Sequence, residues 1–164
     1  MRNSIALSIL AALTCCASAV IAAEPGTTTA VIPEYAESYP AYGVSESVRA
    51  GDFVYIGGII ATDMDGNVIA PYDGKQQVEI VYGRIKKILA AHGATYRNVV
   101  SETIYLTDWV RFGAGADIRK KYFDDDGAAY ASAVGQEVVS LALPGLVLEV
   151  QAVAYVGEKK EVGK

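Results

Sequence analysis

Apolar and polar residues alternate along the last long hydrophobic stretch of the chain. Over residues 146–156, Leu, Val or Ala occupies every second position, and Glu149 and Gln151 lie at positions between them. A period of two is typical of a β-strand with one buried face. The pattern therefore predicts a strand whose other face carries Glu149 and Gln151. A strand is also predicted over residues 133–141, and Leu143-Pro144-Gly145 predicts a tight turn that joins the two strands as a hairpin.

Three earlier segments are also typical of strands. Residues 42–48 and 52–58 are predicted to form a hairpin, because β-prone residues stand on both sides of a turn at residues 49–52. Residues 98–107 predict a further strand, because two sets of residues alternate there. The first set is Val100, Glu102, Ile104 and Leu106, and Ser, Thr or Tyr occupies the positions between them. Residues 63–67 contain the chain-breaking sequence Asp-Gly-Asn and are interpreted as a turn.

The period changes to that of a helix over residues 75–92. One apolar stripe runs along this segment and is formed by Val78, Val81, Tyr82, Ile85, Ile88 and Leu89. Gly93 favours a helix end, so His92 is interpreted as a residue at the helix C-terminus, with a general base as the alternative. A second helical region is predicted from residue 108 to about residue 123, with its regular part at 116–123. The predicted order of elements is β-β-(β)-α-β-α-β-β.

Composition divides the chain into four parts. Residues 1–23 have the features of a secretory signal peptide, with Arg2 before an apolar run and small residues at the cleavage site; a retained anchor is the alternative. Residues 24–41 are expected to form an extended arm. Residues 42–157 form one domain, and residues 158–164 form a charged tail. We therefore expect a periplasmic or secreted protein without a stable membrane span.

Charge and reactive side chains narrow the chemistry. The net charge of −5 becomes about −6 without Arg2, which argues against a nucleic-acid partner. Both cysteines, Cys15 and Cys16, lie in the predicted signal peptide, so the remaining chain has no disulfide and no thiol nucleophile. His92 is the only histidine, which excludes a multi-histidine metal site. Residues 124–126 are three aspartates before a glycine and are interpreted as a solvated turn. We expect no metal and no cofactor.

Three segments together resemble a known family. Residues 51–58 read Gly-Asp-Phe-Val-Tyr-Ile-Gly-Gly, residues 99–108 end in Leu-Thr-Asp, and residues 149–154 read Glu-Val-Gln-Ala-Val-Ala after an earlier Leu-Pro-Gly. In order and spacing they resemble the Rid (YjgF, reactive intermediate deaminase) family from about residue 41 to 156. The resemblance implies a chorismate-mutase-like α+β fold, with one mixed β-sheet and two helices on one face. It also implies a homotrimer with a central barrel and a small-molecule cleft between subunits.

The resemblance implies a reaction and the residues that perform it. Family members hydrolyse an enamine or imine to a 2-keto acid and ammonia, with an Arg that grips the substrate carboxylate and a Glu that handles water. The register places Ala133 at the Arg position and Gln151 at the Glu position, and Val44 replaces an aromatic residue that often lines the cleft. Gln can position water but cannot accept its proton at neutral pH. Loss of the Arg guanidinium, which binds a carboxylate through two hydrogen bonds, weakens carboxylate binding by about two to three orders of magnitude.

These departures lead to a qualified functional prediction. Gln151 and Glu149 are the predicted catalytic residues, and we expect a remodelled cleft that binds a small, less anionic metabolite with weak or altered deaminase activity. One alternative is a competent deaminase in which Glu149 and either Arg111 or Arg119 replace the missing groups. The other is a non-catalytic structural or interaction trimer. The predicted ligand-binding positions are Gly58, Ala133, Gly135 and Gln151.

Overall fold

The computed structural model describes residues 28–31 and 43–157. The predicted signal peptide (1–23), the predicted tail (158–164) and all of the predicted arm except Thr28–Val31 lie outside these residues. The strands of the described part are β1 (Thr28–Val31), β2 (Ser47–Ala50), β3 (Phe53–Ile59), β4 (Val99–Leu106), β5 (Ser132–Glu137) and β6 (Leu148–Tyr155). Its helices are α2 (Gly74–Ala91), α3 (Trp109–Gly113) and α4 (Ala116–Asp125), with a 3-10 turn at Tyr96–Asn98.

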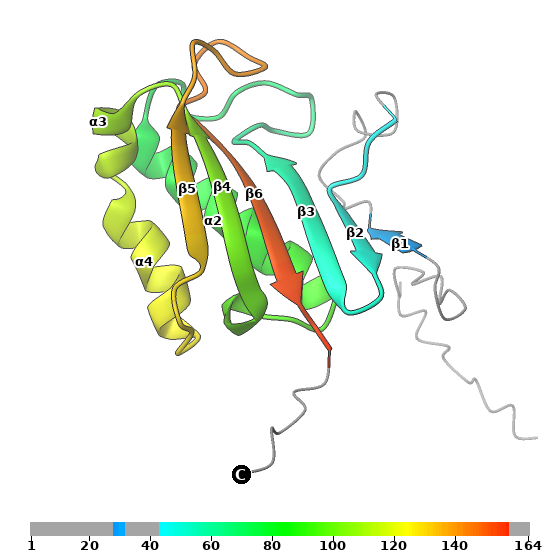
Figure 1. Ribbon diagram of the computed structural model, residues 1–164. Coiled ribbons are helices and arrows are strands. Elements are labelled where there is room, and N and C mark those ends of the chain that lie inside the picture. Colours follow the sequence, from blue (N-terminus) through cyan, green and yellow to red (C-terminus); the bar gives the residue numbers. More distant parts are fainter. Residues whose placement is uncertain (1–27, 32–42, 158–164) are drawn as a thin grey trace, which may run out of the picture.

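The six strands form one mixed sheet in the order β1-β2-β3-β6-β4-β5 (Figure 1). All neighbouring strands are antiparallel except β4 and β5, which are parallel. The predicted hairpin of β2 and β3 is present, although β2 begins only at Ser47. The predicted α+β fold with one mixed sheet is therefore confirmed.

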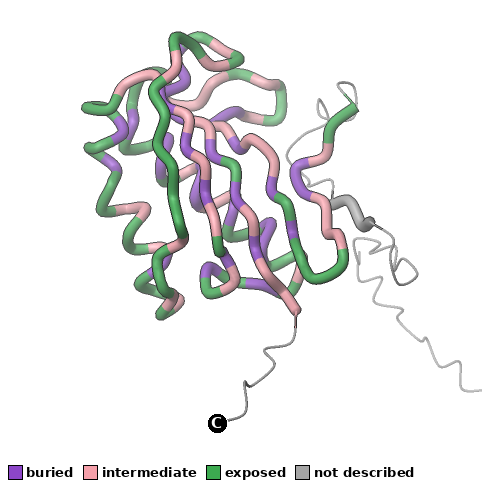
Figure 2. Tube along the Cα trace, viewed as in Figure 1, coloured by how far each residue is buried: buried purple, intermediate pink, exposed green. Residues whose placement is uncertain are grey.

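The last two strands do not form the predicted hairpin, and this prediction was wrong. β4 lies between them, parallel to β5 and antiparallel to β6. The Leu143-Pro144-Gly145 turn belongs instead to a longer connection from the end of β5 to the start of β6. Every residue of β5 is exposed, whereas burial alternates along β6 (Figure 2). The apolar row of β6 is buried because this strand lies in the middle of the sheet, beneath the helices. The exposed strand β5 lies at the edge of the sheet.

The helices cover one face of the sheet. The predicted apolar stripe of α2 is buried and packs with alternate residues of β3, β4 and β6 in the hydrophobic core. The second predicted helical region is divided into α3 and α4. Gly115 stands at the break, because a β-carbon there would lie 2.8 Å from the β-carbon of Val78 on α2. This close approach lets α4 pack on α2. No helix in the described part of the chain covers the opposite sheet face.

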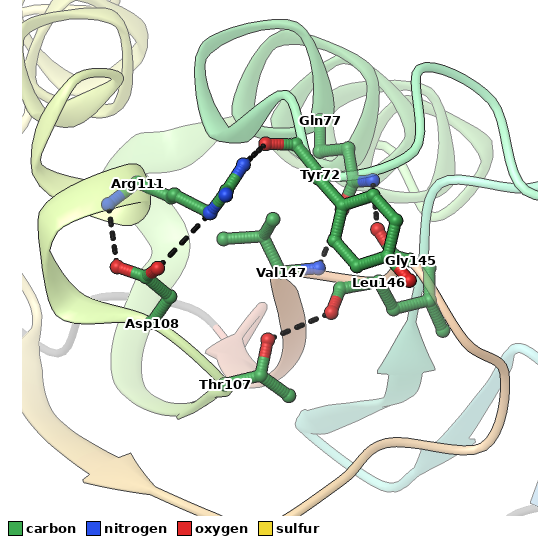
Figure 3. Close-up of polar contacts among 8 residues, drawn as sticks. All are labelled: Tyr72, Gln77, Thr107, Asp108, Arg111, Gly145, Leu146 and Val147. Carbon is green, nitrogen blue, oxygen red and sulfur yellow. Dashed lines mark hydrogen bonds and ion pairs between the residues drawn. The ribbon is translucent and has the colours of Figure 1, made fainter.

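Residues at both ends of α2 cap the helix. The carboxylate of Asp73 accepts a hydrogen bond from the backbone N–H of Gln76, and His92 is the C-terminal cap, as predicted. Gln77 is fully buried and connects two loops (Figure 3). Its Nε2 donates to the carbonyl of Gly145 at 2.9 Å, and its Oε1 accepts from the N–H of Val147 at 2.8 Å. These bonds fix the chain as it enters β6.

Candidate functional site

The polar residues of β6 lie on the sheet face that the helices leave uncovered. Leu148, Val150 and Ala152 are buried on the helix side, whereas Glu149 is half-buried and Gln151 is exposed. The predicted division of this strand into an apolar and a polar face is therefore correct. We call this surface the uncovered sheet face throughout.

A β-bulge lies directly beside Gln151. Ile56 of β3 pairs with Ala152, and Ile59 pairs with Val150, so two residues of β3 stand opposite Gln151 alone. Those two residues are Gly57 and Gly58. Such a bulge disrupts the ladder locally and re-aims neighbouring side chains.

Gly58 allows the side chain of Glu149 to lie against β3. A β-carbon at Gly58 would be 1.9 Å from Oε1 of Glu149, so any other residue at position 58 would force this carboxyl group to move. Burial raises the pKa of the Glu149 carboxyl above its ordinary value. The structure therefore brings Gly58, Glu149 and Gln151 together, three of the positions that the sequence singled out.

An open hollow with a volume of about 330 Å³ extends from Gln151 across the bulge and the neighbouring strands. Gln151 pairs with Thr103 of β4, and Val153 pairs with Ser101 of β4 and with Tyr55 of β3. No residue of the lining is charged. The lining consists of Ser45, Val48, Tyr55, Ile56, Gly57, Ser101, Thr103, Gln151, Ala152 and Val153.

Most of this lining was missed by sequence reasoning. The period of two indicates that Ser101 and Thr103 lie on one face of β4 and that Tyr55 lies on the same face of β3 as Phe53. It does not indicate which of them stand beside Gln151, because this depends on strand order and on the bulge. No local signal identifies Ser45, which precedes β2.

The uncovered sheet face has no positive charge from the strands. Arg49 is the only Lys or Arg in the six strands. It pairs with Val54, which is fully buried on the helix side, and its charge helps to lower the pKa of His92 there. The strands therefore offer no cation that could bind a carboxylate beside Gln151.

Ala133 and Gly135 do not join this hollow within one subunit. Parallel pairing with β4 places Ala133 opposite Glu102, which is buried on the helix side of the sheet. Gly135 lies beneath Trp109 of α3, since a β-carbon there would be 2.4 Å from the Trp109 ring. Both positions therefore face away from Gln151. A single site that includes position 133 and Gln151 needs more than one copy of the chain.

Arg119 is engaged on the helix side of the sheet. Its guanidinium forms an ion pair with the buried carboxylate of Glu102, and its Nε donates to the hydroxyl of Tyr82 at 3.0 Å. The other carboxylate oxygen of Glu102, Oε1, has no hydrogen-bond partner among the described residues. Arg119 therefore contacts buried side chains on the helix side of the sheet and does not reach the uncovered face of its own subunit.

Arg111 lies at the end of the sheet where β4 finishes. Its Nε donates to Asp108 at 3.0 Å and its Nη1 donates to the carbonyl of Tyr72 at 2.6 Å (Figure 3). The guanidinium also lies over the Tyr72 ring. β4 and β5 run in parallel, so Arg111 follows the strand end opposite to Ala133. Neither Arg111 nor Arg119 therefore replaces the missing arginine within a subunit.

His92 is remote from the uncovered sheet face. Its Nε2 and the Ser47 hydroxyl form a 2.9 Å hydrogen bond on the helix side of β2. Burial, assisted by the charge of Arg49, lowers the pKa of His92. This position fits the predicted helix-end residue and gives His92 no contact with Gln151 or Glu149. Val44 is half-exposed before β2.

Other kinds of site receive no support from the described residues. No three or more His, Cys, Asp or Glu side chains in residues 28–31 and 43–157 gather as metal ligands. None of the helices in that part of the chain combines the length and apolar character that crossing a bilayer requires.

Known proteins are similar to this chain in sequence and in architecture. The family model for Endoribonuclease L-PSP matches residues 35–156. A RutC family protein from Pyrococcus abyssi is 32% identical over 111 residues, which cover 68% of this chain and 84% of the relative. A RutC family protein from Pyrococcus horikoshii is also 32% identical over 111 residues, covering 68% and 85%.

Solved structures agree with these relatives. Rv2704 from Mycobacterium tuberculosis, a member of the YjgF/YER057c/UK114 family, is 29% identical with a TM-score of 0.65, covering 79% of this chain and 100% of its own. YyfA from Yersinia pestis, a Rid family protein, has a TM-score of 0.70 at 24% identity, covering 79% and 100%, and shows the fold. TdcF from E. coli, solved with bound serine, is 25% identical with a TM-score of 0.62, covering 68% and 87%.

Fold and site define a small α+β protein whose mixed sheet is covered by helices on one face and exposes a polar hollow on the other. The chain belongs to the Endoribonuclease L-PSP family, which includes YjgF, RutC and Rid proteins.

Proposed function

We propose that this chain is an exported Rid-type protein whose cleft binds a small, less anionic metabolite with weak or altered enamine/imine deaminase activity. One observation carries the proposal: the uncovered sheet face has Gln151 at the water-handling position and no basic residue from any strand. A carboxylate bound there would lose its hydration without gaining a counter-charge. The signal-like sequence of residues 1–23 supports export, which mass spectrometry of periplasmic or secreted protein would test.

The proposal includes a homotrimer with the cleft between subunits. The uncovered sheet face exposes large apolar side chains, including Phe53, Tyr55 and Val134, which are 40%, 51% and 59% exposed. Large apolar side chains exposed on one face of this kind are typical of a protein interface. Position 133 and Gln151 also face opposite sides of one sheet, so only neighbouring subunits bring them to one site.

Glu149 is the candidate for residual hydrolytic chemistry. Its carboxyl lies on the same face as Gln151, and burial raises its pKa toward the range of a general base. In such a reaction Gln151 holds the water by hydrogen bonds and Glu149 accepts its proton. The two residues are about 6.6 Å apart along the strand, so the water is displaced from its usual place in the family.

A nucleic-acid substrate is disfavoured for this chain despite the family's name. Nucleic-acid binding requires clustered Lys and Arg that neutralise phosphates. The chain has a net charge of −5, and its uncovered sheet face receives no basic residue from the strands. An RNA-cleaving role would therefore need a different surface.

A deaminase assay tests the proposal. Iminopropionate is generated in solution, and its loss is followed with this protein and with a homologue that carries the Arg and the Glu. We expect catalysis that is weaker by about 100-fold or more, because the anion-binding fork and the acid at position 151 are both missing. Catalysis equal to that of the homologue would overturn the altered-cleft proposal.

A restored site is the matched control for this assay. Ala133→Arg with Gln151→Glu returns both charged groups, and we expect activity to rise by about tenfold or more. Glu102→Gln is added in a third variant, because Glu102 pairs with position 133, and its unpartnered carboxylate oxygen would attract the new guanidinium. The third variant is expected to be the most active. No gain in either would show that the cleft differs beyond these positions.

A further inference from the structure

We infer that the hollow on the uncovered sheet face recognises a primary carboxamide through the side-chain amide of Gln151. This inference rests on the proposed function and names the chemical class of the ligand.

All polar side chains of the hollow are neutral. Ser45, Ser101, Thr103 and Gln151 supply hydroxyl and amide groups, and no charged side chain lines the surface. Glu149 stands two residues away on the same face and adds a carboxyl. From the subunit that carries Gln151, a ligand carboxylate would therefore meet no cation and would lie near an acid, which disfavours anions.

The amide of Gln151 offers both a donor and an acceptor in one plane. A primary carboxamide offers the complementary pair, so the two groups form two parallel hydrogen bonds. A carboxylate lacks the donor, and an amidinium lacks the acceptor. Gln151 is exposed, and its side-chain amide has no hydrogen-bond partner in the part of the chain that the structure describes. In the proposed trimer a neighbouring subunit would shield Gln151 from water, and a desolvated amide rejects ligands that leave it unpaired.

The rest of the hollow suits a small apolar body. Tyr55 and Val153 form a cross-strand pair beside Gln151, and both line the hollow. Its volume of about 330 Å³ is at the lower end of the range for small-molecule sites. An aromatic or branched aliphatic group attached to the carboxamide would pack on these two side chains.

Four matched probes test the inference on the protein without its predicted signal peptide. Benzamide, benzoate, benzamidine and acetophenone share one ring and differ in hydrogen-bond pattern and charge. Their binding is measured by NMR titration of assigned backbone amides. We expect benzamide to bind about tenfold or more tighter than each of the other three, with the largest shifts around Gln151.

Variants at position 151 give the decisive readout. Gln151→Glu replaces the amide by a carboxylate and is expected to shift the preference to benzamidine. Gln151→Leu is expected to remove the preference of benzamide over acetophenone. Gln136→Glu is the control: Gln136 is exposed on the edge strand β5, is not part of the hollow, and should leave the preference unchanged.

The outcomes separate this inference from the proposed function. Equal binding of benzamide and acetophenone would overturn the carboxamide inference and leave a cleft for uncharged ligands. Tightest binding of benzoate would overturn both. Absence of shifts around Gln151 with every probe would also overturn both, because no small uncharged ligand would then occupy the hollow.

Discussion

Glu149 shows how two neighbouring positions set the chemistry of a single carboxyl group. Gly58 leaves room for its side chain, and the strands provide no cation nearby. Burial therefore raises its pKa without an opposing charge. A raised pKa means that the folded protein binds a proton more tightly than the unfolded chain does. Stability is then highest when Glu149 is protonated and falls as the pH rises through its folded pKa.

We expect Glu149→Gln to stabilise the protein above the ordinary glutamate pKa of 4.5 and to have little effect below it. The neutral amide removes the cost of burying a carboxylate, and that cost is absent where glutamate is protonated in both states. Urea denaturation across a pH series measures the difference. Glu137→Gln, on the exposed edge strand β5, is the control. Destabilisation by Glu149→Gln near neutral pH would indicate that the carboxylate has a stabilising partner.

At the level of elements, two arginine ion pairs of the helical layer differ in how deeply they are buried. Arg119 of α4 pairs with Glu102 of β4, and these side chains are 18% and 0% exposed. Arg111 of α3 pairs with Asp108 within one turn, and these side chains are 48% and 37% exposed. A buried carboxylate that loses its partner retains the cost of desolvation, whereas an exposed one regains water.

We predict that Arg119→Gln lowers the free energy of unfolding by about 3–5 kcal/mol. The matched change Arg111→Gln on α3 should cost about 1 kcal/mol or less. Chemical denaturation at neutral pH measures both. Addition of Glu102→Gln to Arg119→Gln should recover part of the loss, because the unpaired buried charge is then removed. Equal losses from the two arginine variants would contradict the view that Glu102 is the buried counter-ion of Arg119.

At the level of the whole molecule, the two sheet faces have different surroundings. One face is buried beneath α2, α3 and α4 (Figure 1). The other exposes apolar side chains around a neutral hollow. The proposed trimer would cover part of that second face and place position 133 of one subunit near the uncovered face of another. Assembly and site are therefore coupled in the proposal.

Light scattering of residues 24–164 is expected to give three times the mass of one chain. Val134→Arg introduces a charge on the uncovered sheet face and should reduce the mass, because an unpaired charge in an interface is costly. Val110→Arg changes an even more exposed valine, on α3, and should leave the mass unchanged. A monomer in the unmodified protein would remove the proposed intersubunit site.

Local patterns in the sequence determined the elements of this protein. The stripe of α2 and the two faces of β6 follow from the geometry of a single helix or strand, which repeats every 3.6 or every two residues. The same periodicity identified Glu149 and Gln151 as residues of one polar face. The helix end at His92 was predictable because Gly93 follows it, and glycine favours the end of a helix.

Only the tertiary structure decided how these elements meet. The partner of a strand is set by burial across the whole sheet, so β4 separates β5 from β6 although a short turn sequence lies between them in the chain. The parallel pairing of β5 turns Ala133 toward Glu102 and away from Gln151. The bulge at Gly57 and Gly58 shapes the hollow. Such relations depend on contacts between residues far apart in sequence, and no local period encodes them.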